Sequence, residues 1–132
     1  MTKPSLLSAS LRSRVVRFCT MASPREACGL LAGTPGRALK VYPCRNVSEQ
    51  PDRYEITPRA VYDASVDADR YGWVLIGGWH SHPRGPDRLS DADLSDAPEL
   101  PDWVHVLVSL DTQPETVRAF VVDGGVPLEV LV

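Results

Sequence analysis

Apolar side chains recur at three- and four-residue spacing near the start of the chain. Leu7, Leu11, Val15 and Phe18 carry this periodicity. Such spacing places the apolar side chains on one face of an amphipathic helix. We therefore predict a helix over residues 6–20, with Ser5 or Ser8 as its N-cap.

Strand-like segments and a second helix follow. CGLLAG and RALKVYPC are separated by a turn at Thr34, Pro35 and Gly36, which is typical of a β-hairpin. After the polar stretch NVSEQPD, the segment RYEIT is predicted to form a short strand. Thr57 then serves as an N-cap and Pro58 as the first residue of a helix that ends near residue 71.

The second half of the chain alternates apolar runs with turn residues. WVLIGGW is predicted to form a buried strand that leads directly into HSHP. A short helix is predicted over residues 90–97. WVHVLVSL, TVRAFVVD and PLEVLV are predicted to be three further strands. Two main helices and six or seven strands indicate a mixed α/β fold, and 132 residues suit one domain, which we expect to span 1–132.

Composition and charge exclude several classes of function. A formal net charge of -3 without a basic run offers no electrostatic surface for nucleic acid. No segment approaches the roughly 20 apolar residues of a membrane span, and the N-terminus lacks a signal-peptide pattern, so we expect a cytoplasmic protein. Cys19, Cys28 and Cys44 form no CxxC pair and are expected to be buried thiols, not a disulfide framework or a zinc knuckle.

The HSHP segment is a candidate metal site. In extended backbone, His80 and His82 project from the same face, with Cα atoms roughly 6 to 7 Å apart. Pro83 favours an extended conformation at His82 and then turns the chain. Both imidazoles are therefore expected at the exposed end of a strand, where they can converge on one ion.

Asp93 supplies a third candidate ligand. It occupies the third position of the short helix if Ser90 is the N-cap, so its carboxylate can fold back toward the histidines. Two His, one Asp and one open coordination position are typical of catalytic zinc, whereas structural zinc sites usually have four protein ligands. Taken separately, the HxH pair is also compatible with a surface strand, and Ser90 with Asp93 is compatible with a simple capping box.

Taken together, these residues resemble a known family. His80-Ser81-His82-Pro83, followed by Ser90 and Asp93, resembles the HxHP…SxxD signature of the JAMM, or MPN-plus, zinc metalloproteases, and PREACGLLAG resembles the family's early segment. The resemblance extends over about residues 24–109. It departs from the family pattern at Leu89, where proline is frequent, and at Gly78, where an aromatic residue is frequent.

The resemblance implies a fold, a reaction and a substrate class. The expected fold is a single curved mixed β-sheet of the JAB/MPN type, with an architecture like that of cytidine deaminases. His80, His82 and Asp93 would hold one Zn²⁺, Glu26 would act as general base and then general acid, and Ser90 would donate a hydrogen bond to the oxyanion. The implied substrate is a ubiquitin-like or β-grasp sulfur-carrier protein, cut after its C-terminal Gly-Gly tail.

Two alternatives share parts of the pattern. A catalytically inactive MPN-type interaction scaffold has the same fold but loses the metal ligands, which this chain keeps. A RadC-like DNA-repair-associated protein shares the HxHP…SxxD arrangement but generally carries a further N-terminal region, for which we expect no room here. The HExxH pattern and the HxE and PCxxC motifs of zinc deaminases are absent. His105 lies outside the ligand spacing and is interpreted as a strand residue.

Overall fold

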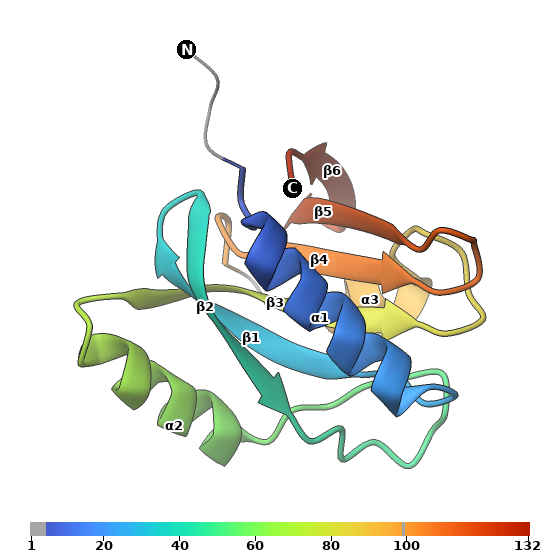
Figure 1. The fold of residues 1–132 in the computed structure, drawn as a ribbon, viewed down its shortest axis with the longest axis horizontal. Coiled ribbons are helices and arrows are strands. Elements are labelled where there is room, and N and C mark those ends of the chain that lie inside the picture. Colours follow the sequence, from blue (N-terminus) through green and yellow to red (C-terminus); the bar gives the residue numbers. More distant parts are fainter. Residues whose placement is uncertain (1–4, 99) are drawn as a thin grey trace.

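A six-stranded mixed β-sheet organises the protein in the computed structural model, which describes residues 5–98 and 100–132 (Figure 1). The strand order is β2-β1-β3-β4-β5-β6, with β3 and β4 parallel and all other neighbours antiparallel. The strands are β1 (Cys28–Thr34), β2 (Arg37–Cys44), β3 (Val74–His82), β4 (Val104–Ser109), β5 (Thr116–Asp123) and β6 (Val126–Val130). No helix within the described residues is long and apolar enough to cross a membrane. The mixed α/β class predicted from the sequence is confirmed.

Helix α1 (Ala9–Ala22) covers one face of the sheet, as the blue helix in Figure 1. Ser8, not Ser5, is its N-cap, because the Ser8 hydroxyl accepts a hydrogen bond from the backbone N–H of Leu11. Phe18 stacks on Trp79 of β3 with ring centroids 6.0 Å apart. The indole also lies over Gly29, where an added Cβ would come within 2.3 Å of the ring. The apolar periodicity therefore identified the buried helix face correctly.

Helix α2 (Pro58–Asp69) contacts β1, β2 and β3. Thr57 is its N-cap and Pro58 its first residue, as predicted. The Asp67 carboxylate accepts hydrogen bonds of 2.6 Å from Lys40 Nζ and Tyr42 Oη on β2. Side chains alternate along a strand, and Val41 belongs to the core beneath α1. Lys40 and Tyr42 therefore place α2 against the opposite face of the sheet.

The strand predicted at RYEIT is wrong. This segment lies in irregular backbone between β2 and α2, so the sheet has six strands, the smaller of the two numbers predicted. The Asn46 side chain occupies the hydrogen-bonding groups that a neighbouring strand would need: its Oδ1 accepts from Glu55 N and its Nδ2 donates to the Arg53 carbonyl. Val47 N also donates to the Glu55 carbonyl. Local side-chain bonds thus replace a strand ladder here.

Strand β3 positions the histidines. It lies between β1 and β4, and its last residue, His82, pairs with Ser109. Strand alternation directs Trp79 toward α1 and the following His80 toward the other face, where His82 also projects. The short helix α3 (Asp91–Ser95) follows the turn after β3. The sequence therefore correctly predicted that the two histidines share one face at the end of a strand. The prediction that this end is exposed is wrong, because both side chains are buried.

Candidate metal centre

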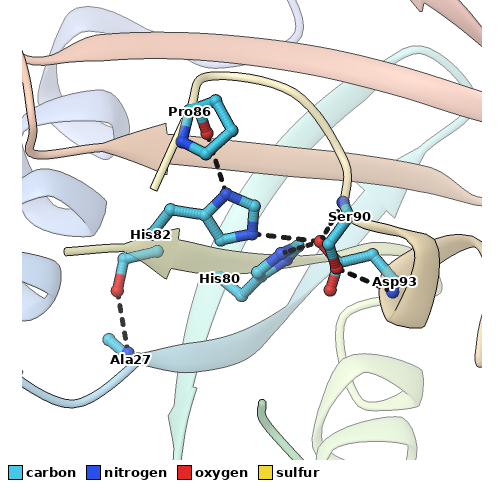
Figure 2. A network of polar contacts seen from close by, with 7 residues as sticks. Ala27, His80, His82, Pro86, Ser90 and Asp93 are labelled. Carbon is cyan, nitrogen blue, oxygen red and sulfur yellow. Dashed lines mark hydrogen bonds and ion pairs between the residues drawn. The ribbon is translucent and has the colours of Figure 1, made fainter. Parts of the chain in front are cut away.

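Four side chains converge on one point at the end of β3. Glu26, His80, His82 and Asp93 each offer a ligand atom, and these atoms lie within 4.8 Å of one another. Glu26 comes from the loop before β1. The histidines come from β3 and Asp93 from α3 (Figure 2). Glu26 is 5% exposed, His80 1% and His82 6%. Three separate segments thus build one largely buried polar cluster.

One carboxylate oxygen of Asp93 joins the helix cap to the histidines. Asp93 Oδ2 lies 3.1 Å from His80 Nε2 and 3.0 Å from His82 Nε2, and it accepts a hydrogen bond of 2.9 Å from Ser90 N (Figure 2). The Ser90 hydroxyl in turn accepts from Asp93 N, which completes a capping box. The capping box and the ligand cluster are therefore not alternatives, because the cap aims the carboxylate at the histidines.

A main-chain carbonyl fixes the tautomer of His82. His82 Nδ1 lies 2.9 Å from the carbonyl oxygen of Pro86. A carbonyl oxygen can only accept, so Nδ1 carries the proton and the Nε2 of the neutral ring keeps its lone pair. That lone pair faces Asp93 Oδ2, another acceptor. A proton or a bound cation between the two acceptor atoms removes the repulsion between their lone pairs. When a metal ion binds, it takes the place of the proton.

Charge and burial in the cluster favour a bound cation. Burial opposes ionisation of Asp93, but the contacts of its carboxylate with His80 and with His82 in its protonated form outweigh burial and hold the pKa of the carboxyl well below its usual range. Burial raises the pKa of Glu26 to about 7. Glu26 Oε1 is also buried without a hydrogen-bond partner. An anionic carboxylate, two imidazoles and an unsatisfied carboxyl oxygen are a donor set suited to a divalent metal ion.

Tyr54 packs against the other histidine. Its ring stacks on His80 with centroids 4.5 Å apart and an interplanar angle of 25°. Burial lowers the pKa of His80 and thus favours the neutral imidazole that a metal requires. The stacked ring restricts the orientation of His80. No pattern in the sequence predicts this contact, because Tyr54 is brought to His80 by the path of the irregular segment after β2.

Two hydrogen-bonded links hold the backbone around Glu26. Asn46 Nδ2 donates to the Glu26 carbonyl at 3.0 Å. Ala27 N donates to Ser81 Oγ at 2.8 Å, and Ser81 N donates to the Ala27 carbonyl at 3.1 Å. The histidine strand is thus tied directly to the glutamate segment. Ser81, between the two histidines in sequence, therefore has a structural role that the HxH pattern does not specify.

The remaining residues singled out from the sequence lie at or near the cluster. Ser90 lines a hollow together with Glu26 and His82, and its hydroxyl proton is free to be donated because the oxygen accepts from the helix backbone. Cys28 pairs with His80 across β1 and β3, but burial raises the pKa of its thiol to about 12. His105 lies in β4 and is not among the converging donors.

Comparisons with known proteins agree with this geometry. The family described as "Prokaryotic homologs of the JAB domain" matches residues 8–123. A CysO-cysteine peptidase of Mycobacterium tuberculosis is 33% identical over 131 residues, which covers 94% of this chain and 87% of the relative. A probable TtuB-protein conjugate cleaving protease of Thermus thermophilus is 34% identical over 78% of this chain, and a desampylase of Pyrococcus furiosus is 32% identical over 61%. The matched region spans 66% of the Thermus protein and 58% of the Pyrococcus protein.

Solved structures share the fold. The solution structure of a protein from Desulfitobacterium hafniense has a TM-score of 0.85 and 29% identity, and the match covers 94% of this chain and 88% of that one. A JAB1/MPN domain protein from Archaeoglobus fulgidus has a TM-score of 0.63 at 18% identity and covers 98% of this chain and 94% of its own, a likeness of fold alone. The family match extends over most of the sequence and includes Glu26, His80, His82 and Asp93. This chain belongs to the family of prokaryotic homologues of the JAB domain.

Proposed function

We propose that this protein is a zinc-dependent peptidase that hydrolyses an amide bond after the C-terminal Gly-Gly tail of a ubiquitin-like or β-grasp sulfur-carrier protein. The observation that carries the proposal is the convergence of Glu26, His80, His82 and Asp93 within 4.8 Å. His80, His82 and Asp93 hold the metal, and two His with one carboxylate are a ligand set of catalytic zinc sites. When bound, Zn²⁺ supplies Lewis acidity and lowers the pKa of water toward ~7.

Glu26 is the acid–base residue in this proposal. Burial raises the pKa of this carboxyl in the metal-free site. In the proposed reaction the carboxylate would accept a proton from the attacking water and then give that proton to the leaving amine. Its carbonyl is anchored by Asn46, and the next residue is anchored by Ser81, so the side chain starts from a fixed backbone.

Ser90 stabilises charge on the substrate carbonyl oxygen. Its oxygen accepts from Asp93 N, which leaves the hydroxyl proton for donation into the hollow that Glu26 and His82 also line. Removal of one well-aimed oxyanion donor costs about 10²–10³ in kcat in other hydrolases. A Ser90→Ala variant would lose this donor and also the helix N-cap. Ser90→Thr keeps the hydroxyl and is therefore the control variant for Ser90→Ala.

The names of the relatives support the substrate class. Proteins similar to this chain are named a CysO-cysteine peptidase, a TtuB-protein conjugate cleaving protease and a desampylase. All three names denote hydrolysis at a conjugate or adduct. We propose for this chain the same type of reaction, with a carrier protein that ends in Gly-Gly as the acyl side of the bond.

A cleavage assay with matched variants tests the proposal. Purified protein is incubated with β-grasp proteins extended beyond Gly-Gly, and the products are measured by intact mass. Wild type should release the extension. Glu26→Gln should keep stoichiometric zinc but release the extension about 10²–10⁴-fold more slowly, and His82→Ala should lose both zinc and cleavage. Absence of zinc from the wild-type protein would instead support an interaction scaffold. Normal turnover by Glu26→Gln would exclude the proposed role of the glutamate.

A further inference from the structure

The turn between β3 and α3 carries the Pro86 carbonyl, which accepts the hydrogen bond of His82 Nδ1. Residues 83–89 of this turn form neither helix nor strand. Among the described residues, no main-chain hydrogen bond joins the turn to itself or to another element. The side chain of Leu89 anchors its end in a small apolar cluster with Phe120 of β5. The position of the Pro86 carbonyl therefore depends on side-chain contacts.

Three consecutive carbonyls of the turn each accept a hydrogen bond from a different side chain. The Gly85 carbonyl accepts from Ser109 Oγ at 3.0 Å. The Asp87 carbonyl accepts from Arg118 Nη1 at 2.8 Å. The carbonyl between them is the acceptor of His82 Nδ1 at 2.9 Å (Figure 2). The two outer hydrogen bonds thus hold the peptide groups on either side of the one that orients the imidazole.

Ser109 reaches the turn from the strand end that lies beside His82. The two residues pair across the parallel strands β3 and β4, and Leu110 N donates to the His82 carbonyl at 3.2 Å. Ser109 is 1% exposed, so its hydroxyl is shielded from water that could compete for the Gly85 carbonyl. The backbone of His82 and the hydroxyl that holds the turn therefore share one rigid part of the sheet.

Arg118 of β5 presents its donor to the turn in a fixed orientation. Its Nε and Nη2 donate to the two carboxylate oxygens of Glu129 on β6 at 2.9 and 2.7 Å. The guanidinium carbon also lies 5.0 Å from the ring centroid of Phe120. This two-point contact with a carboxylate fixes the plane of the guanidinium and leaves Nη1 for the turn. The Asp87 carboxylate is farther from Nη1, at 3.5 Å, than the Asp87 carbonyl is.

We propose that Arg118 and Ser109 are positioning residues for the metal ligand His82. They hold the carbonyls on either side of the Pro86 carbonyl, which keeps this acceptor at Nδ1 and leaves Nε2 available for the metal. The inference rests on the proposed role of His82 as a zinc ligand. Removal of a group that orients a ligating imidazole typically lowers metal affinity about 10- to 100-fold. Arg118 and Ser109 act through one further contact, so we expect about tenfold for each.

Zinc affinity, measured by competition with a chelator, tests the proposal without turnover. Arg118→Gln and Ser109→Ala should each raise the Kd for Zn²⁺ about tenfold. Asp87→Asn removes the charge of the carboxylate but keeps the main-chain carbonyl, so its Kd should equal that of wild type. An unchanged Kd in Arg118→Gln or in Ser109→Ala would overturn the role of that residue. An equal rise in Asp87→Asn would overturn the role of the carbonyl contact.

The imidazole proton of His82 separates positioning from general stability. In zinc-loaded wild type, the Nδ1–H should give a resolved proton resonance that exchanges slowly with water. In Arg118→Gln and Ser109→Ala this exchange should be faster, while that of the Val106 amide, in the buried middle of β4, should be unchanged.

Two results of this measurement would overturn the proposal. One is an equal acceleration at both protons, which would indicate general destabilisation, and the other is rapid exchange of the imidazole proton in wild type. Both results leave the peptidase function intact. A wild-type protein that binds no zinc would instead overturn the peptidase function together with this inference.

Discussion

Replacement of Glu26 by glutamine should have opposite effects on stability and activity. The Glu26 side chain is almost completely buried, and one of its oxygens has no hydrogen-bond partner. Burial raises the pKa of the carboxyl from 4.5 to about 7. At pH 8 the metal-free protein must therefore keep a buried carboxylate ionised. Glutamine has nearly the same shape and no charge, so Glu26→Gln should remove this cost.

The size and sign of the effect follow from proton linkage. Between pH 4.5 and 7, the folded protein binds more protons at Glu26 than the unfolded chain does. The contribution of Glu26 to the free energy of unfolding therefore falls as pH rises through this window. A shift from 4.5 to about 7, at about 1.36 kcal/mol per pH unit, corresponds to about 3 kcal/mol at pH 8. Below pH 4.5 the carboxyl is protonated in both states and the difference should vanish.

Denaturant unfolding in excess chelator measures this difference. Wild type and Glu26→Gln are compared at pH 4.5 and pH 8, with Glu49→Gln, an exposed carboxylate, as the control. In chelator the variant should be more stable than wild type at pH 8 by about 3 kcal/mol. In separate assays with zinc-loaded protein, its hydrolysis rate should fall by about 10²–10⁴. A variant that is less stable than wild type at pH 8, or one that gains equally at both pH values, would refute the reasoning.

Three further predictions concern the metal and its surroundings. His82→Ala should lose bound zinc by elemental analysis, whereas His105→Ala should keep a stoichiometric ion, since His105 is outside the converging donors. Chelation should abolish hydrolysis and added Zn²⁺ should restore it, so full activity in excess chelator would contradict the metal's role. Zinc at a concentration 100-fold above its Kd should also stabilise the fold by about 2.7 kcal/mol, measured as a higher melting temperature. Asn46→Ala removes four hydrogen bonds, so it should lower the free energy of unfolding in urea by about 2 kcal/mol and should also lower kcat. Unchanged stability would show that these hydrogen bonds are dispensable.

The sequence predicted best those features that depend on local backbone geometry. The apolar face of α1 repeats with the helical period, so it could be identified without knowledge of what covers it. His80 and His82 share a face because strand side chains alternate, whatever their surroundings. Ser90 and Asp93 form the predicted cap because the capping box is a contact within one turn. Each of these patterns has its cause within a few residues.

Features set by tertiary contacts could not be predicted in the same way. RYEIT has the β-branched and aromatic residues of a strand, yet its backbone bonds to the side chain of Asn46, which precedes it in the irregular segment after β2. The stacking of Tyr54 on His80 depends on where that segment passes. The family resemblance supplied the expected position of Glu26, but its burial and its unpartnered oxygen arise only when the chain is folded. Burial by segments that are distant in sequence, unlike periodicity, produces no pattern among neighbouring residues.

The bond from His82 Nδ1 to the Pro86 carbonyl has a consequence for how this site tolerates sequence change. Every amino acid carries a main-chain carbonyl, so no side-chain replacement at position 86 can delete the acceptor itself. Only a change in the path of the turn after β3 can remove it. The turn can therefore vary in side chains, and so in what it presents to a substrate, while the imidazole keeps the same nitrogen available for the metal.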